Sequence, residues 1–169
     1  NAALAAYLAE RAPEGVTVLH FHGLCRELVK EAGFAIRPIK DQQELYDVVL
    51  PEMLLEALDQ TGALFDAIIV DEGQDFKENW WLPLVNLLRD QDQGILFVFY
   101  DDNQNLYHGA KQISTVVDEA PFPLIDNCRN TQKIHGLVSL FHQDGLQLRC
   151  PGPAGRPPEV LEYSDPKGM

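Results

Sequence analysis

The 169-residue sequence predicts an α/β fold in which a parallel sheet is flanked by helices. Two short apolar runs rich in β-branched and aromatic residues, at 65–70 and 94–100, are typical of strands buried on both faces of such a sheet. Segments with apolar residues at helical spacing alternate with these runs, as in a doubly wound layer. A polar, acidic turn follows each run, and ligands of α/β sheets bind beyond the carboxyl ends of strands.

Five segments carry apolar residues at helical spacing and are expected to be helices. They are 1–11, 22–32, 51–62, 80–88 and 130–141. Gly33 and Gly62 are suited to end the second and third helices, and Asn130 to cap the last one. Asp41 with Glu44 resembles a capping box, and Pro51 can open a helix because it needs no backbone N–H there.

Further short strands are expected at 16–19, 123–125 and 160–163, with a Gly/Pro-rich connector at 151–158. With 46% apolar residues the chain has material for one ordinary core. Its first residue is Asn1, within a predicted helix, so we expect the chain to be internal to a longer protein.

The formal net charge is -13, so the chain alone should bind DNA poorly, because Lys and Arg supply the counterion release that dominates nucleic-acid affinity. No apolar run approaches the roughly 20 residues that cross a bilayer. We therefore expect no membrane partner and a cytoplasmic location. Three widely spaced cysteines do not resemble a disulfide framework and are expected to be reduced thiols.

The most informative segment is 68–75, in which an apolar strand delivers Asp71 and Glu72 to the edge of the sheet. Phosphoryl transfer uses this arrangement: one carboxylate holds Mg²⁺ and its neighbour orients or deprotonates the attacking water. Two alternatives stay open. The turn can be a solvated acidic loop, or Asp71 can be the nucleophile of a hydrolase.

Two later segments carry further candidates. Gln104 lies in the polar turn 101–107 and can hydrogen-bond a terminal phosphate in one nucleotide state only. Arg129 lies between a predicted strand and a helix, where a guanidinium can stabilise a transferring phosphoryl group. The alternatives are a polar turn that caps a short helix and a surface arginine paired with nearby acids.

Taken in order, these segments resemble motifs of the UvrD/Rep-like superfamily 1 helicases. Asp71-Glu72-Gly73-Gln74-Asp75 resembles motif II, 101–107 resembles motif III (G-D-x-x-Q-x-I-Y), and 124–134 resembles motif IV (L-x-x-N-Y-R-S with a later Ile). In addition, 21–24 is similar to the T-F-H-G/S-L segment, and 1–5 to the tail of motif Ia. The resemblance runs from Asn1 to about Tyr163.

The resemblance implies a RecA-like P-loop NTPase fold that lacks the Walker A strand and loop. Residues 1–122 would be the remainder of the first lobe (1A), and 123–169 the start of the second (2A). The implied cofactors are ATP and Mg²⁺, the metal held by Asp71 and Glu72 and the nucleotide contacted by Asp71, Gln104 and Arg129. Gln74, Gln104 and Arg129 would couple the phosphate state to lobe closure.

The implied partner is single-stranded or partly duplex DNA, bound by a longer parent that supplies the missing helicase lobes in cis. The nucleic-acid contacts would be Phe21, His22, Tyr107 and His108. The chain departs from the family pattern at three positions. Tyr100 replaces the motif III glycine, Cys128 replaces the motif IV tyrosine, and Gly109 stands where an aromatic residue often stacks a base.

No G-x-x-x-x-G-K-[ST] loop occurs in the sequence, and motifs V and VI are absent. We therefore expect the chain alone neither to bind ATP tightly nor to hydrolyse it. Two other interpretations remain. The chain can be a degenerate helicase-like lobe that serves as a regulatory or binding module in a larger protein, for example one linked to a nuclease. Separately, His20, His22 and Cys25 have a spacing that could hold a transition metal, although no fourth ligand is evident.

Overall fold

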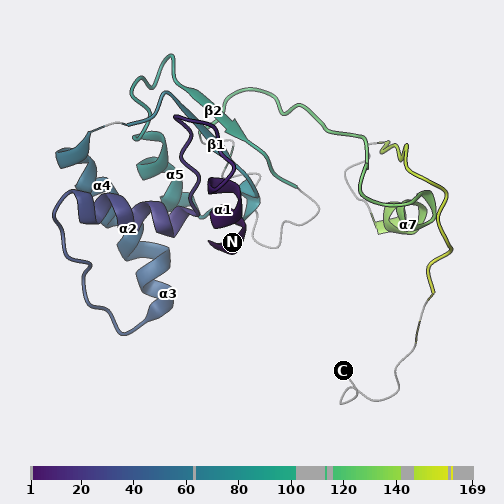
Figure 1. Cartoon of the computed structure of the whole chain (residues 1–169), viewed down its shortest axis with the longest axis horizontal. Coiled ribbons are helices and arrows are strands. Elements are labelled where there is room, and N and C mark those ends of the chain that lie inside the picture. Colours follow the sequence, from purple (N-terminus) through teal and green to yellow (C-terminus); the bar gives the residue numbers. More distant parts are fainter. Residues whose placement is uncertain are drawn as a thin grey trace. The chain divides into compact units, whose positions relative to one another are not determined.

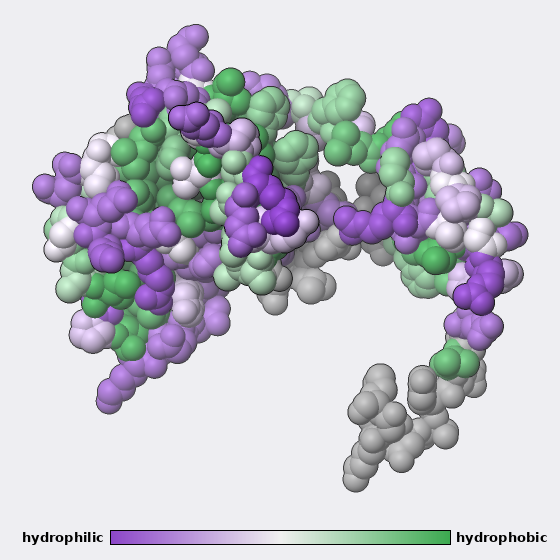
Figure 2. Space-filling model, viewed as in Figure 1, coloured by the Kyte–Doolittle hydropathy of each residue, from purple (hydrophilic) through white to green (hydrophobic). Residues whose placement is uncertain are grey.

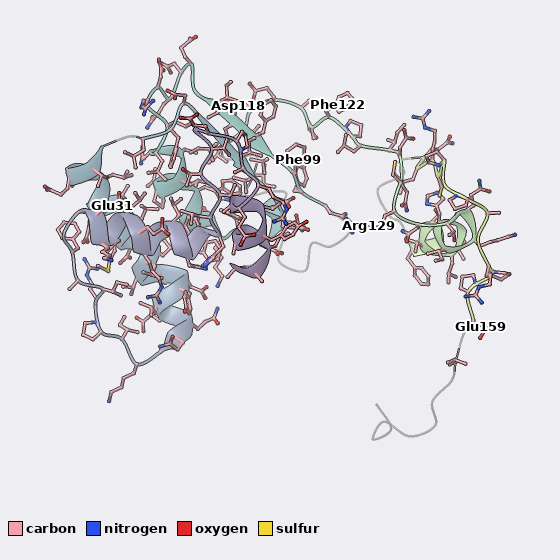
Figure 3. The ribbon with its side chains drawn as sticks, viewed as in Figure 1. Glu31, Phe99, Asp118, Phe122, Arg129 and Glu159 are labelled. Atoms are coloured by element: carbon pink, nitrogen blue, oxygen red, sulfur yellow. The ribbon has the colours of Figure 1, made fainter. Side chains whose placement is uncertain are left out.

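The computed structural model describes residues 2–62, 64–101, 113, 116–141, 147–159 and 161. The chain divides into two compact units, Asn1–Asp118 and Glu119–Met169. An extended segment carrying Phe122 follows Asp118 (Figure 3). This division lies close to the boundary predicted between residues 122 and 123, while the identity of the units as helicase lobes stays a prediction.

The first unit begins with a series of helices, and its two described strands follow with α5 between them (Figure 1). Its described elements are α1 (Ala2–Ala9), α2 (Phe21–Glu31), α3 (Gln42–Glu44), the π-helical turn η1 (Leu45–Val49), α4 (Leu50–Thr61), β1 (Ala67–Val70), the 3-10 turn η2 (Gly73–Asp75), α5 (Glu78–Val85) and β2 (Ile95–Val98). In the second unit the described elements are α7 (Gln132–Val138) and η4 (Ser139–Phe141). None of the described helices is long and apolar enough to span a membrane.

The predicted helices form, and their ends follow local chemistry. Gly33 and Gly62 take positive φ angles of 80° and 71° where α2 and α4 end, a conformation that glycine adopts without steric cost. The Asp41 side chain caps α3 by accepting from the N–H groups of Gln43 and Glu44. The sequence analysis missed the cap of α2, where His20 Nδ1 accepts from the Gly23 N–H at 3.1 Å.

The two strands pair in parallel, with Ile68 opposite Leu96 and Val70 opposite Val98. Ile68 and Val70 face the helices and are 9% and 4% exposed. Helix α2 packs on α4, and α4 packs on α5. The largest fully buried side chains of the core are Trp81, Leu50, Met53, Leu54, Leu87, Val29, Pro51 and Cys25. The chain is thus a mixed α/β protein whose small parallel sheet is flanked by helices.

The prediction that both strands are buried on both faces is wrong. Ile69, Ile95 and Phe97 point away from the core and are 68%, 51% and 58% exposed. Successive side chains of a strand point to opposite faces, and among the described residues the buried core lies on the face that carries Ile68 and Val70. Hydrophobic residues accordingly reach the surface in several places (Figure 2).

Two predicted strands do not form. Residues 16–19 run without strand pairing, and Val16 is 53% exposed. The segment 123–125 likewise is not a strand, and the parallel pairing beside it is a single bridge between Asp126 and Arg149. A β-prone sequence becomes a strand only where a partner accepts its hydrogen bonds. The segment predicted at 160–163 lies largely outside the described residues.

The prediction that Asn130 caps the last helix is wrong as well. Thr131 occupies the position before α7 and makes no side-chain capping bond. The first N–H groups of α7, from Gln132 and Lys133, instead donate to the carbonyls of Pro153 and Ala154 at 2.9 and 3.1 Å. The Gly/Pro-rich connector therefore satisfies donors that a side chain satisfies at most helix starts.

Leu54→Ala should lower the free energy of unfolding by about 2–5 kcal/mol, because Leu54 is fully buried and truncation leaves a cavity. Leu55→Ala is the matched control, because Leu55, the next residue of α4, is 37% exposed. Urea unfolding followed by circular dichroism measures both. Equal losses in the two variants would contradict the assignment of the core face of α4.

Candidate functional site

The acidic turn after β1 has an unusual backbone conformation at its second carboxylate residue. Glu72 has φ 54° and ψ 45°, the only positive φ of a non-glycine residue in the described ranges. A non-glycine residue in this region costs about 1–3 kcal/mol and such residues cluster at functional sites. The Glu72 N–H donates to Asp71 Oδ1 at 3.1 Å. Both side chains are exposed, so a ligand can reach them.

Gln74 joins this turn to the end of the neighbouring strand. Its side-chain Oε1 accepts from the backbone N–H of Asp101 at 3.0 Å, and its Nε2 donates to Glu72 Oε2 at 2.6 Å. The backbone N–H can only donate, so it decides which end of the amide faces which partner. Gln74 is 3% exposed, the one buried polar side chain among the described residues. The two strand ends therefore meet at one edge of the sheet, as the sequence predicts.

Gly73 lets the turn lie directly on β2. Its N–H donates to the Phe99 carbonyl at 2.9 Å, and the Phe99 N–H donates to the Val70 carbonyl at 2.8 Å. A Cβ at position 73 would lie 2.5 Å from Val98 Cγ1, closer than carbon atoms approach. The turn thus holds the carboxylates in place through a contact that a larger residue would prevent.

The site is acidic and suits a hard cation held with few protein ligands. Among the described residues no ion pair involves Asp71 or Glu72, and no group of three or more His, Cys, Asp or Glu could hold a metal. Mg²⁺ is usually bound by one or two carboxylates together with waters and substrate phosphates. Asp71 and Glu72 are compatible with that mode of binding, although Gln74 already occupies one oxygen of Glu72.

The structure does not test where the other predicted site residues lie relative to these carboxylates. Gln104, Tyr107 and His108 lie outside the described residues. Arg129 is exposed and belongs to the second unit, where its backbone N–H donates to Asn127 Oδ1 at 3.2 Å. Their roles stay predictions from the sequence.

Phe21 and His22, the predicted nucleic-acid contacts, lie in an aromatic cluster of the first unit. The Phe21 ring stacks on Trp80 with centroids 5.0 Å apart, so that ring face is used in packing. The His22 ring meets the Trp80 and Tyr46 rings edge to face at 4.7 and 5.0 Å. Burial lowers the pKa of His22 below its ordinary value of 6.5, against a hydrogen bond to the Tyr46 backbone that raises it.

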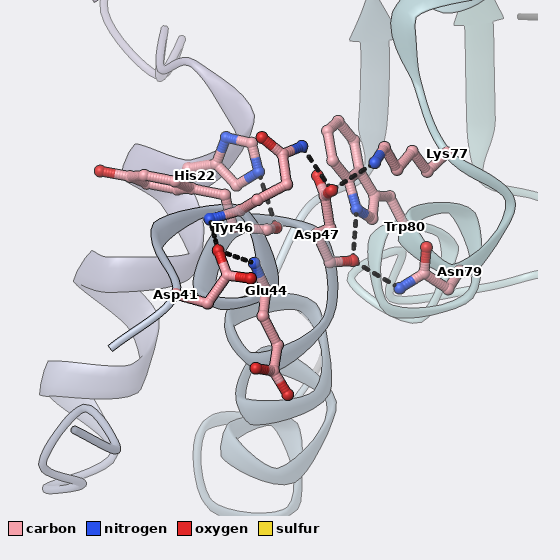
Figure 4. Close-up of polar contacts among 9 residues, drawn as sticks. His22, Asp41, Glu44, Tyr46, Asp47, Lys77, Asn79 and Trp80 are labelled. Atoms are coloured by element: carbon pink, nitrogen blue, oxygen red, sulfur yellow. Dashed lines mark hydrogen bonds and ion pairs between the residues drawn. The ribbon is translucent and has the colours of Figure 1, made fainter. Parts of the chain in front are cut away.

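A proline explains why side chains from two other helices converge on η1. Pro51 has no N–H, so it cannot bond to the Asp47 carbonyl in an α-helical pattern or to the Tyr46 carbonyl in a π-helical one. His22 Nε2 donates to the Tyr46 carbonyl at 3.0 Å instead (Figure 4). Trp80 Nε1 donates to the Asp47 carbonyl, also at 3.0 Å. The sequence analysis missed these contacts, and the proline within a helical run is the signal that could have indicated them.

These side chains border a hollow of about 870 Å³ in the first unit, a size typical of small-molecule sites. Its lining is His22, Gln43, Tyr46, Asp47, Gln74, Asp75, Phe76, Lys77 and Trp80. Asp47 pairs with Lys77 across it, and Gln43 Nε2 donates to Asp47 Oδ2 at 2.5 Å. Burial alone would raise the pKa of Asp47, but the bonds from Lys77 and Gln43 outweigh it and lower that pKa.

The transition-metal interpretation of His20, His22 and Cys25 is wrong for the described structure. His20 Nδ1 caps α2, and His22 Nε2 bonds to a carbonyl. Cys25 is fully buried in the core, and burial raises the pKa of its thiol to about 12. A thiol that stays protonated is a poor metal ligand. All three cysteines of the chain are free thiols.

No protein-family model, curated protein or solved structure matches the chain.

Gly73→Ala should destabilise the chain by about 1–3 kcal/mol, because the added methyl overlaps Val98. Gly136→Ala is the control. A Cβ at position 136 meets nothing within 4 Å, and alanine is the better helix former. Thermal unfolding of both variants tests the contact. A neutral Gly73→Ala would show that the turn does not press on β2 as described.

Stability should depend on pH through His22. Its folded pKa lies below 6.5, so the unfolded chain takes up the proton first as the pH falls. The contribution of His22 is therefore complete above pH 6.5 and is lost as the pH falls toward the lower folded pKa. His22→Gln keeps a donor for the Tyr46 carbonyl but cannot titrate. Urea unfolding across this range should show wild type gaining stability relative to His22→Gln as the pH rises; a constant difference would contradict this.

Proposed function

We propose that this chain is part of an ATP-driven motor that moves on single-stranded nucleic acid, most similar to the superfamily 1 helicases, and that its first unit is a RecA-like lobe without its phosphate loop. The observation that carries the proposal is the bridge made by Gln74. This buried amide joins the Glu72 carboxylate after β1 to the Asp101 backbone after β2. Parallel, neighbouring strands that end in polar turns are where α/β proteins bind nucleotides.

Asp71 and Glu72 would divide the chemistry between them. Asp71 would hold Mg²⁺, which neutralises charge on the phosphates when bound, and Glu72 would orient and deprotonate the attacking water. Glu72 accepts a hydrogen bond from the buried Gln74 and has a left-handed backbone, which supports a role different from that of Asp71. Gln74 would keep the Glu72 carboxylate in position through its hydrogen bond.

Coupling to movement would use the same amide. Because Gln74 contacts both strand ends, a displacement of the turn that begins at Asp101 would reach Glu72 through one side chain. Gln104 in that turn and Arg129 in the second unit are the sequence-predicted partners of this step. Gln74 would thus transmit a change in the turn at Asp101 to the hydrolytic glutamate, as in proteins whose loops respond to the state of a bound phosphate.

The chain alone lacks the donors that a polyphosphate needs. With a net charge of -13 and no glycine-lysine loop, the carboxylates would repel ATP rather than hold it. The chain by itself is therefore expected to be inactive. Steady ATP turnover by this chain that Glu72→Gln abolishes would contradict that expectation.

A second candidate is a degenerate lobe that acts as a regulatory or binding module. The net charge of -13 favours it, and so does the occupation of Glu72 Oε2 by Gln74. The two candidates differ in one property of the longer protein. A motor needs an intact phosphate loop upstream, whereas a module does not.

In a longer protein that contains the phosphate loop, Glu72→Gln should lower kcat for ATP by about 10²–10⁴, because a positioned general base contributes that factor. The amide still accepts from Gln74, so the turn should keep its shape. Glu78→Gln, at an exposed position of α5, is the control and should leave kcat unchanged. Phosphate release with saturating single-stranded DNA measures both. Full activity in Glu72→Gln would exclude the motor proposal.

A further inference from the structure

The hydrolytic site leaves the hollow beside η1 and η2 without a role. The hollow lies entirely within the first unit and combines aromatic rings with a few polar groups. Its rings come from His22, Tyr46, Phe76 and Trp80, and its charged pair is formed by Asp47 and Lys77 (Figure 4). Flat aromatic walls with a small number of polar groups are characteristic of sites for planar, hydrogen-bonding ligands.

The polar groups of the hollow include acceptors that remain available. Both Gln43 and Lys77 bond to Asp47 Oδ2, so lone pairs of Oδ1 are left. His22 donates through Nε2 to the Tyr46 carbonyl, which makes Nδ1 of the neutral ring an acceptor. The lowered pKa values of Asp47 and His22 keep the first ionised and the second neutral near pH 7. A ligand that donates N–H groups is thus matched better than one that only accepts.

Charge limits what part of a nucleic acid can bind here. Among the described residues that line the hollow, Lys77 is the single Lys or Arg, and it is already paired with Asp47. Arg26 lies over the Tyr46 ring, with its Cζ 5.6 Å from the centroid. Two carboxylates, Asp47 and Asp75, line the hollow too. Phosphates gain little next to these groups, so affinity has to come from stacking and base-edge hydrogen bonds.

We propose that this hollow binds one unstacked nucleobase with an exocyclic amino group, that is adenine, cytosine or guanine. The base would stack on the Tyr46 ring, which is 36% exposed and has Arg26 Cζ 5.6 Å from its centroid. Its amino group would donate to Asp47 Oδ1 or His22 Nδ1. The proposal rests on the proposed nucleic-acid track and adds Tyr46 and Asp47, which the sequence did not indicate, to His22, which it did.

The position of the hollow links it to the hydrolytic carboxylates. Gln74 lines the hollow and also donates to Glu72 Oε2 at 2.6 Å. A base bound there would therefore lie next to the side chain that holds the hydrolytic glutamate. This adjacency provides a short route by which the nucleic-acid strand influences hydrolysis.

The test uses the full 169-residue chain and the two tryptophan indole N–H signals in an NMR titration. The ligands are adenosine, thymidine, and eight-nucleotide single strands of dA, dC, dT and abasic sites. The Trp80 indole, which bonds to the Asp47 carbonyl, should shift on binding, whereas the Trp81 indole in the core should not. Strands of dA and dC should bind about tenfold more tightly than dT. The logarithm of the binding constant should fall with the logarithm of the salt concentration with a slope of about -0.7, the value for one phosphate contact.

Matched variants test the assignment to these residues. Tyr46→Ala should weaken dA binding by about tenfold, because the stacking surface is lost. Tyr46→Phe, which keeps the ring, should bind like wild type, and so should Tyr7→Ala at an exposed position of α1. Asp47→Asn should lower the preference for dA over dT, because one acceptor of the carboxylate becomes a donor, with Asp59→Asn on α4 as its control. Circular dichroism melting shows that each variant is folded.

Two sets of outcomes decide the question. Binding of adenosine as tight as that of the dA strand assigns the site to free nucleosides, while tighter strand binding assigns it to a polymer, and both support the base pocket. An unshifted Trp80 signal with every ligand, equal binding of dA and abasic strands, or unchanged binding by Tyr46→Ala overturns it. Because binding is read without ATP, failure of the hydrolysis proposal in Glu72→Gln is a separate result.

Discussion

The backbone of η2 lies so close to the end of β2 that no side chain fits at position 73. That contact rests on the N–H of Gly73 donating to the Phe99 carbonyl and on the parallel register of the two strands. It turns the chain after Asp71 and leaves Glu72 in a left-handed conformation. Gln74 then falls in the interior, where only its two hydrogen bonds make burial of an amide tolerable. The carboxylates therefore owe their position to a glycine contact and a buried amide.

A missing donor organises the neighbouring part of the unit in a comparable way. Pro51 removes one N–H from the helical run, and the carbonyls of Tyr46 and Asp47 accept side-chain donors from α2 and α5 instead. Segments about 30 residues apart in sequence are joined at this point. These contacts also bring aromatic rings and the Asp47 carboxylate to the border of the hollow. Gln74 lines the same hollow and is hydrogen-bonded to Glu72 of the acidic turn.

The first unit thus has two chemically different surfaces connected through one side chain. The acidic turn has carboxylates and no ion pair among the described residues, which suits a cation and phosphates supplied from elsewhere. The hollow has aromatic walls and a neutral histidine, which suits an uncharged ring. A net charge of -13 is consistent with both surfaces, because neither the acidic turn nor the hollow attracts a polyanion through its own charge.

Local sequence determined the helices α2, α4 and α5, the glycines that end two of them, the Asp41 cap and the location of both apolar runs, because these depend on neighbouring residues alone. It also placed Asp71 and Glu72 at a strand end. Only the tertiary structure decided that Ile69, Ile95 and Phe97 stay exposed, that residues 16–19 find no strand partner, and that Tyr46, Asp47, Lys77 and Trp80 meet. Burial and pairing depend on which distant segments pack together, and apolar content or spacing along the chain does not record that choice.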